Sequence, residues 1–323
     1  MNDKPIIRLE NLKVHFPVTN GLRKKFLRAV DGVSLSVYPG ETVGLVGESG
    51  CGKSTLGRAV TGLLDATDGE IFYHDTNVKE LKKNDKIKFR KNVQMVFQDP
   101  AASLNPRLKV SQIIMEPLLY NVDMSKGEKK QLVEKIAETV GLPADALERY
   151  PHEFSGGQQQ RIGIARSLVL NPEFIVCDEA VSALDVSVQA QILNLLKQLK
   201  KDYNLTYLFI SHNLSVVKHM CDRIIVMYLG KIVEIGTAEQ IFENPLHPYT
   251  KALLSAIPVA GKKNRENRIV LSGDLPSPSD VIPGCAFHNR CYECQENCGG
   301  QCPELKEVEK GHWVSCLKYA EKS

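Results

Sequence analysis

The sequence predicts an α/β fold: a core of buried strands with helices packed on it, a helical subdomain inserted into that core, and a small cysteine-rich extension at the C-terminus. Three observations predict it. Short apolar runs alternate with helical patterns along most of the chain. Residues 106–150 carry helical patterns without a strong strand. Six of the nine cysteines fall between Cys285 and Cys316.

The bulk composition is that of an ordinary globular protein. Of the 323 residues, 43% are hydrophobic and 24% charged, and the net charge of +3 is too small to indicate a nucleic-acid partner. The N-terminus MNDKPIIRLE lacks the layout of a signal peptide, and no long apolar run predicts a membrane span. We therefore expect a cytosolic protein with reduced thiols, in which clustered cysteines favour metal binding over disulfides.

The core strands are expected at apolar runs that end in turns. The first two are residues 6–12 and 30–37, and the later ones are ETVGLVGES, NVQMVFQ, EFIVCDE, LTYLFISH and RIIVMYLG. Helical patterns lie between them, such as SVQAQILNLLKQLKK, which places Val188, Ile192 and Leu199 on one face. The inserted helices are predicted from IIMEPLLYNV and EKKQLVEKIAETVGL.

The clearest chemical signal is GESGCGKST at residues 47–55, which fits the phosphate-loop pattern G-x-x-x-x-G-K-[ST]. It follows a predicted strand and opens a helical segment, the context that the pattern requires. Its glycines let backbone N–H groups point at phosphate oxygens, and the helix N-terminus favours an anion. Lys53 would reach the β- and γ-phosphates, and Ser54 would hold Mg²⁺.

A second carboxylate is needed to complete the Mg²⁺ site, and the run FIVCD offers it. Asp178 closes this predicted strand, and Glu179 follows directly, where it would polarise an attacking water. An acidic pair at a strand end is weak evidence alone, but beside a phosphate loop it is strong.

Further motifs, in order along the chain, resemble those of the ATP-binding-cassette (ABC) ATPases. FSGGQ at residues 154–158 resembles their LSGGQ signature, with Phe in place of Leu. The other matching positions are Phe16 in LKVHF, similar to the aromatic residue that stacks on adenine, Gln98 in VFQDP, similar to the Q-loop glutamine, Ser182-Ala183-Leu184-Asp185, similar to the D-loop, and His212 in FISHN, similar to the switch histidine.

The resemblance implies a RecA-like core that uses ATP and Mg²⁺. In ABC ATPases the phosphate loop and the signature meet only across a head-to-tail dimer that sandwiches ATP, so a second ATPase subunit is implied. The implied catalytic residues are Lys53, Gln98, Glu179 and His212, and the implied Mg²⁺ ligands are Ser54, Gln98 and Asp178. The implied ATP-binding residues are Phe16, Gly47, Glu48, Ser49, Gly50, Cys51, Gly52, Lys53, Ser54, Thr55, Gln98, Asp178 and, from the signature, Ser155, Gly156, Gly157 and Gln158.

Longer segments of the sequence indicate which branch of the ABC ATPases the chain resembles. FQDPAASLNPR, RYPHEFSGGQQQRIGIAR and NPLHPYTKALLSAIP are similar to ATPase subunits of oligopeptide and dipeptide importers, of the OppF/DppF-like type. The implied partners are an OppD/DppD-like ATPase, two membrane permeases and an extracellular binding protein, with no nucleic acid, at the cytoplasmic face of the membrane. The expected domains are an ABC ATPase over residues 1–258, whose core spans 1–98 and 160–258 around a helical subdomain at about 99–159, and the extension over 259–323.

The extension carries a pattern that some members of this importer family use to bind a [4Fe–4S] cluster, GC-x-FH-x-RC followed by further cysteines. The resemblance selects Cys285, Cys291, Cys298 and Cys316 as ligands. Cys294 and Cys302 are additional, and Cys294 forms C-x-x-C with Cys291, so a zinc site and unligated thiols stay open as alternatives. Cys51, Cys177 and Cys221 are interpreted as small buried hydrophobic residues.

Other functions also stay open at this point. A soluble ABC ATPase acting on DNA or ribosomes usually carries a long coiled-coil insertion or two cassettes, and this chain shows neither. A non-hydrolysing regulatory subunit would be expected to lack Glu179. Importers of nickel and other small solutes use similar ATPases.

Overall fold

The computed structural model describes residues 4–20, 23–257, 268–273, 276, 277 and 279–320 of the chain. The chain divides into two compact units, each assembled from several stretches of sequence. Unit 1 comprises residues 1–7, 37–41 and 72–210, and unit 2 comprises residues 8–36, 42–71 and 211–323. The expected boundary between residues 258 and 259 lies outside the described residues.

Unit 1 contains three parallel strands in the order β6 (Val93–Val96), β7 (Phe174–Asp178) and β8 (Thr206–Ile210). Every residue of β7 and β8 is buried, as their continuous apolar sequences predict for parallel strands. The register sets Val96 against Cys177 and Asp178 against Ile210, so the carboxyl ends of the three strands lie at one edge.

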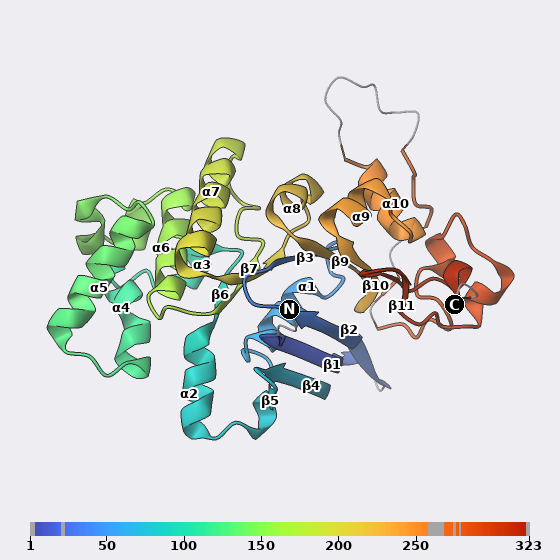
Figure 1. The fold of residues 1–323 in the computed structure, drawn as a ribbon, viewed down its shortest axis with the longest axis horizontal. Helices are drawn as coiled ribbons and strands as arrows, with labels where there is room; N and C mark the ends of the chain where they lie inside the picture. Colours follow the sequence, from blue (N-terminus) through green and yellow to red (C-terminus); the bar gives the residue numbers. More distant parts are fainter. Residues whose placement is uncertain (1–3, 21–22, 258–267, 274–275, 278, 321–323) are drawn as a thin grey trace. The chain divides into compact units, whose positions relative to one another are not determined.

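The helices of unit 1 include the predicted helical stretch. They are α2 (Lys83–Asn92), α3 (Pro100–Ser103), α4 (Val110–Asn121), α5 (Lys126–Thr139), α6 (Gly156–Leu168) and α7 (Val186–Tyr203). Helices α4, α5 and α6 pack on one another (Figure 1). A capping box begins α5: the Ser125 hydroxyl accepts from the Glu128 N–H at 3.3 Å, and the Glu128 carboxylate accepts from the Ser125 N–H at 2.8 Å.

Unit 2 holds most of the strands. One group has the order β2 (Arg23–Val37), β1 (Ile7–Asn20) and β4 (Asp68–Tyr73). The last two residues of β4 belong to unit 1, where they pair with β5 (Thr76–Asn77). The other has the order β3 (Thr42–Val46), β9 (Arg223–Tyr228), β10 (Lys231–Thr237), β12 (His312–Val314) and β11 (Lys306–Glu309). Its helices are α1 (Lys53–Val60), α8 (Leu214–Met220), α9 (Ala238–Glu243) and α10 (Pro248–Ser255).

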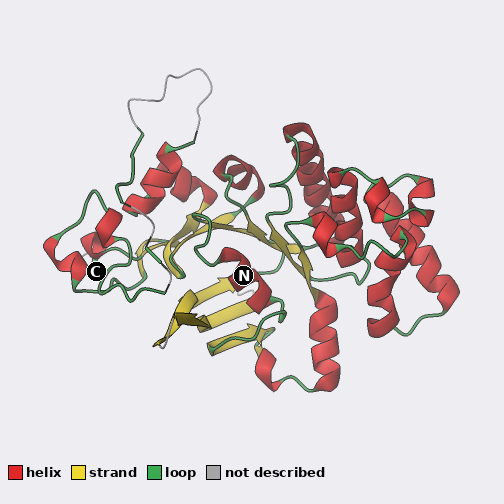
Figure 2. Cartoon of the chain, turned by 180° about the vertical axis from the view of Figure 1, so that it is seen from behind, coloured by secondary structure: helices red, strands yellow, loops and turns green. Residues whose placement is uncertain are grey.

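The described residues of the C-terminal extension, 268–273, 276, 277 and 279–320, lie largely in loops (Figure 2). Its strand β12 nevertheless pairs antiparallel with β10, with Val314 opposite Glu234 and Trp313 opposite Ile235. Val314 is only 1% exposed. The extension therefore continues the sheet of unit 2 and shares its apolar interior.

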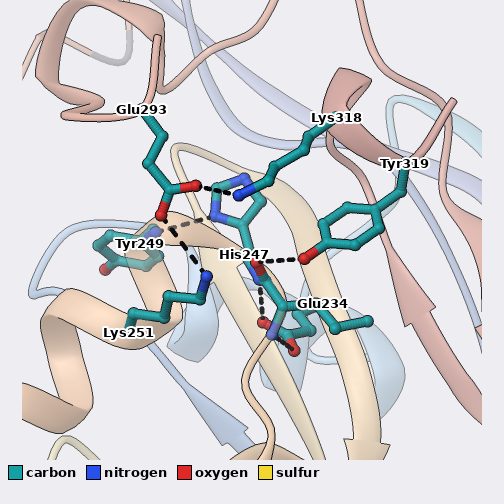
Figure 3. A network of polar contacts seen from close by, with 8 residues as sticks. Glu234, His247, Tyr249, Lys251, Glu293, Lys318 and Tyr319 are labelled. Carbon is teal, nitrogen blue, oxygen red and sulfur yellow. Dashed lines mark hydrogen bonds and ion pairs between the residues drawn. The ribbon is translucent and has the colours of Figure 1, made fainter.

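Polar contacts, some of them buried, also attach the extension to the rest of unit 2 (Figure 3). Glu234 is fully buried, and its carboxylate accepts from the Leu246 N–H at 2.7 Å, from the His247 N–H at 2.9 Å and from His312 Nε2 at 2.8 Å. Glu293 of the extension pairs with Lys251 of α10 at 3.5 Å. These contacts join β10, α10 and the extension.

Across the part of the chain that the structure describes, no helix combines the length and apolar character needed to cross a membrane.

Candidate active site

The phosphate loop lies in unit 2, between the end of β3 at Val46 and the start of α1 at Lys53. Gly47 and Gly52 have φ values of 152° and 102°, which disfavour any side chain. A Cβ at Gly47 would collide with the carbonyl oxygen of Met227, and one at Gly52 with that of Ala29. The glycines are therefore required both by conformation and by the close approach of neighbouring backbone.

The Lys53 ammonium is folded back over this loop. Its Nζ donates to the carbonyl oxygens of Gly47 at 2.9 Å and Glu48 at 2.8 Å, and the residue is only 5% exposed. These two carbonyl oxygens hold the Lys53 ammonium against the phosphate loop, where its positive charge would attract an anion. Ser54 follows in the first turn of α1.

Two other predicted residues of unit 2 lie on its surface. Phe16 lies in β1 and is 36% exposed, so part of its side chain is accessible to a ligand. His212 is exposed in the turn before α8, next to Asn213, whose side chain caps that helix.

Unit 1 brings together Gln98, Asp178 and Glu179. Asp178 is the last residue of β7 and is 2% exposed. Glu179 follows in the left-handed region, with φ at 45°, and its N–H donates to the Ile210 carbonyl of β8 at 3.0 Å. Gln98 follows β6, and its Nε2 donates to the Glu179 carboxylate at 2.9 Å. A non-glycine residue with a positive φ, such as Glu179, is strained, and such strain is typical of a functional position.

The signature residues form the start of α6 in unit 1. Ser155 is the N-cap, and its Oγ accepts from the Gln158 N–H at 3.4 Å, while Gln158 Oε1 accepts from the Ser155 N–H at 3.1 Å. A Cβ on Gly157 would overlap the Val188 side chain of α7. Ser155 and Gly156 are exposed, so the helix start presents a hydroxyl and backbone N–H groups to solvent.

Two residues that the sequence did not predict contact the phosphate loop. The Tyr249 hydroxyl of α10 accepts from the Glu48 N–H at 2.8 Å, and the Arg290 guanidinium of the extension pairs with the Glu48 carboxylate at 2.8 Å. Both residues lie about 200 positions or more beyond the loop, and a single sequence carries no signal that would place them there.

In the extension, one cavity is lined by the four cysteines that the sequence selects, Cys285, Cys291, Cys298 and Cys316, together with residues such as His247 and Phe287. Cys294 and Cys302 do not line it and are exposed. Burial raises the pKa of Cys285 and of Cys291 to about 11. Within the described residues, no group of three or more His, Cys, Asp or Glu side chains is placed to hold a metal ion.

The other three cysteines are buried, as their interpretation as small hydrophobic residues requires. Cys51 is 1%, Cys177 0% and Cys221 7% exposed. Burial raises the pKa of Cys177 to about 12, which keeps this thiol neutral.

Comparison with known proteins places these features in a family. Residues 30–182 match the family model described as "ABC transporter", and residues 233–298 match "Oligopeptide/dipeptide transporter, C-terminal region". The chain is 51% identical to the putative oligopeptide transport ATP-binding protein YkfD of Bacillus subtilis, covering 99% of this chain and 97% of that one. It is 48% identical to the oligopeptide transport ATP-binding protein OppF of Escherichia coli, covering 98% and 96%.

Solved structures give the same result for the fold. The dimeric structure of the bacterial ABC transporter cassette MJ0796 has a TM-score of 0.64 and 29% identity, covering 72% of this chain and 98% of that one. The post-hydrolysis state of the same cassette, bound to ADP and Pi, also has a TM-score of 0.64, with 28% identity and the same coverage. The predicted α/β ABC ATPase fold is confirmed, and the chain belongs to the ABC transporter family, among the ATP-binding proteins of its oligopeptide/dipeptide branch.

Proposed function

We propose that this protein is the ATP-binding and ATP-hydrolysing subunit that powers an ABC importer for oligopeptides or dipeptides. The observation that carries the proposal is that one chain contains three features together: the phosphate loop before α1, a glutamate with positive φ after β7, and signature residues at the exposed start of α6. About half of the residues of this chain are also identical to those of oligopeptide transport ATP-binding proteins.

In this proposal the phosphate loop binds the nucleotide through the N–H groups of residues 47–55, and Lys53 contacts the β- and γ-phosphates. Ser54, Gln98 and Asp178 hold Mg²⁺, which neutralises charge on the phosphates. Glu179 takes a proton from the attacking water, and His212 contacts the γ-phosphate. Phe16 stacks on the adenine. The exposed Phe16 and the Gln98–Glu179 hydrogen bond support these roles.

The signature residues 155–158 act on a nucleotide held by a second subunit. A hydroxyl and N–H groups at an exposed helix start suit a phosphate that arrives from outside the chain. We propose an OppD/DppD-like ATPase as this second subunit, at the cytoplasmic face of the membrane, below two permeases and supplied by an extracellular binding protein. The proposed domains are an ATPase over residues 1–258, with its helical subdomain at about 99–159, and the extension.

We further propose that Cys285, Cys291, Cys298 and Cys316 hold a [4Fe–4S] cluster. Four thiols around one cavity are the donor set that this cluster requires. A single Zn²⁺ on four thiolates is the alternative occupant of the same cysteines. Bound iron would favour the thiolate form over the thiol, and the cluster would hold the loops of the extension together.

Two measurements test this function. Phosphate release from MgATP by the purified wild type should be lost in Lys53→Ala, and ATP-driven uptake into vesicles that carry the cognate permeases should favour peptides over nickel. To test for the cluster, anaerobically purified protein should contain iron and sulfide and absorb at about 400 nm. Cys285→Ser should lose both signals and Cys294→Ser should keep them, whereas a colourless protein with stoichiometric zinc would refute the cluster.

A further inference from the structure

The extension reaches the phosphate loop through one arginine. Arg290 donates from its two terminal nitrogens to the two carboxylate oxygens of Glu48, at 2.8 Å and 3.2 Å. The Arg290 side chain is 10% exposed and that of Glu48 is 28% exposed. A bidentate pair in this partly buried setting fixes both direction and distance, unlike a pair of mobile surface charges.

The arginine is held in place by an aromatic cluster. Phe287 is 1% exposed, and its ring lies 5.2 Å from that of Tyr228 and 5.4 Å from that of Tyr249. One turn later, the Arg290 N–H donates to the Phe287 carbonyl at 3.0 Å. The Arg290 guanidinium lies 6.0 Å from the centre of the Tyr228 ring. The burial of Phe287 therefore determines where the guanidinium is placed.

The same cluster also fixes the loop backbone at Glu48. Tyr249 is fully buried, and its hydroxyl accepts from the Glu48 N–H at 2.8 Å. The Glu48 carbonyl accepts from Lys53. The Glu48 carbonyl also accepts from the Cys51 N–H at 3.3 Å, so each polar group of Glu48 has a defined partner, and two of the four partners come from residues beyond 248.

Glu48 is a carboxylate within a loop whose ligand is a polyanion. An unpaired negative charge there would repel phosphate and would compete for Lys53. We propose that Arg290 is a positioning residue for the nucleotide reaction: it neutralises Glu48 and holds it against the extension, so that the loop offers Lys53 and its N–H groups to the phosphates. This inference rests on the proposed ATP-binding function and extends it to the C-terminal extension.

The experiment compares MgATP hydrolysis by four variants with the wild type. Arg290→Gln should raise KM for MgATP roughly three- to tenfold and leave kcat within about twofold, since the pair is partly solvated. Arg290→Lys keeps the charge but not the two-point contact, and its KM should be intermediate. Lys310→Gln, which removes a charge from an exposed turn of the same extension, should match the wild type.

The deciding variant is Glu48→Gln/Arg290→Gln. If Arg290 acts by neutralising Glu48, removal of the carboxylate should return KM to within about twofold of the wild type. A KM that stays as high as in Arg290→Gln alone would overturn the proposal, as would a folded Arg290→Gln with unchanged KM.

A second measurement separates this inference from the proposed function. If the wild type binds no ATP, the proposed function fails and the inference fails with it; if it binds ATP, the pair is judged independently of turnover by thermal unfolding of Glu48→Gln, Arg290→Gln and the double variant. Strictly additive losses of stability would show that Glu48 and Arg290 are not coupled and would overturn the inference, whereas a double variant as stable as Arg290→Gln alone would support it.

Discussion

Gln98 and Glu179 are joined by a hydrogen bond in which the Gln98 amide donates to the Glu179 carboxylate across 2.9 Å. The two residues follow β6 and β7, which are adjacent and parallel, so their turns meet at the same edge. Glu179 has a φ of 45°, a conformation that non-glycine residues rarely adopt. The amide orients a carboxylate that the backbone has already placed.

Replacement of Glu179 by Gln tests its role as a base. The side chain keeps an acceptor oxygen for Gln98 but can no longer take a proton, so we expect phosphate release to fall about 10²-fold or more. ATP should still bind, and light scattering should show a dimer that persists with MgATP. Unchanged turnover would exclude Glu179 as the base.

Replacement of Gln98 by Ala tests the orienting hydrogen bond. We expect kcat to fall about tenfold, and the double variant with Glu179→Gln to lose little more than the glutamate variant alone, because the orientation of residue 179 matters little once it can no longer take a proton. Gln94→Ala is a matched control: Gln94 lies on β6 itself, and its amide donates to the Arg90 carbonyl. Equal losses for both variants would contradict the specific role of Gln98.

Sequence reasoning predicted the parts of the site that depend on local sequence. The phosphate loop and the acidic end of β7 are contiguous segments, and their backbone requirements are visible as glycines and as a continuous apolar run. The strands themselves were less well predicted: β1 and β2 span 14 and 15 residues, well beyond the predicted 6–12 and 30–37. Pro17 and the turn signals after it indicate an earlier strand end than the structure has.

The attachment of the extension could not be predicted. Strand β12 has three residues and β11 has the charged sequence KEVE, so neither has the apolar alternation of a strand. Glu234 interrupts an apolar run, and its burial depends on partners up to 78 positions away. Such pairings depend on tertiary contacts between distant segments, and no periodicity or motif spacing in a single sequence predicts which segments will meet.

Replacement of two serine N-caps of the helical region distinguishes an effect on stability from an effect on turnover. Ser155 caps α6 and Ser125 caps α5 with the same kind of capping box. Each Ser→Ala change should cost about 1 kcal/mol in urea unfolding. Only Ser155→Ala should also lower turnover, by roughly tenfold, because its hydroxyl is proposed to contact the nucleotide of the second subunit. A matching loss of turnover in Ser125→Ala would assign the effect to stability.

The buried carboxylate of Glu234 should be the strongest polar anchor of the extension. Glu234→Ala leaves three donors without their acceptor, and we expect a loss of about 3–5 kcal/mol in the free energy of unfolding. Glu234→Gln retains one acceptor oxygen and should lose less. Glu309→Ala, an exposed change on β11, should stay within about 0.5 kcal/mol of the wild type. A small loss for Glu234→Ala would show that the strand pairing alone suffices.

His247 should make stability depend on pH below neutrality. The residue is 1% exposed, and its Nδ1 accepts from the Tyr249 N–H at 3.0 Å, which caps α10. Burial lowers its pKa from the ordinary 6.5 to about 4, although the nearby Glu234 and Glu293 oppose the shift. The unfolded chain therefore binds this proton at a higher pH than the folded protein does.

The sign of the effect follows from that difference. The contribution of His247 to stability is complete above pH about 6.5 and is lost as the pH falls towards about 4, with a slope of up to about 1.4 kcal/mol per pH unit. His247→Asn keeps a capping acceptor but cannot titrate, so its urea-unfolding profile should be flatter by about one proton over this range. His219→Asn, at an exposed position, should retain the wild-type slope. If His247→Asn kept that slope as well, another group would have to carry the proton, and the buried neutral histidine would not account for the acid sensitivity.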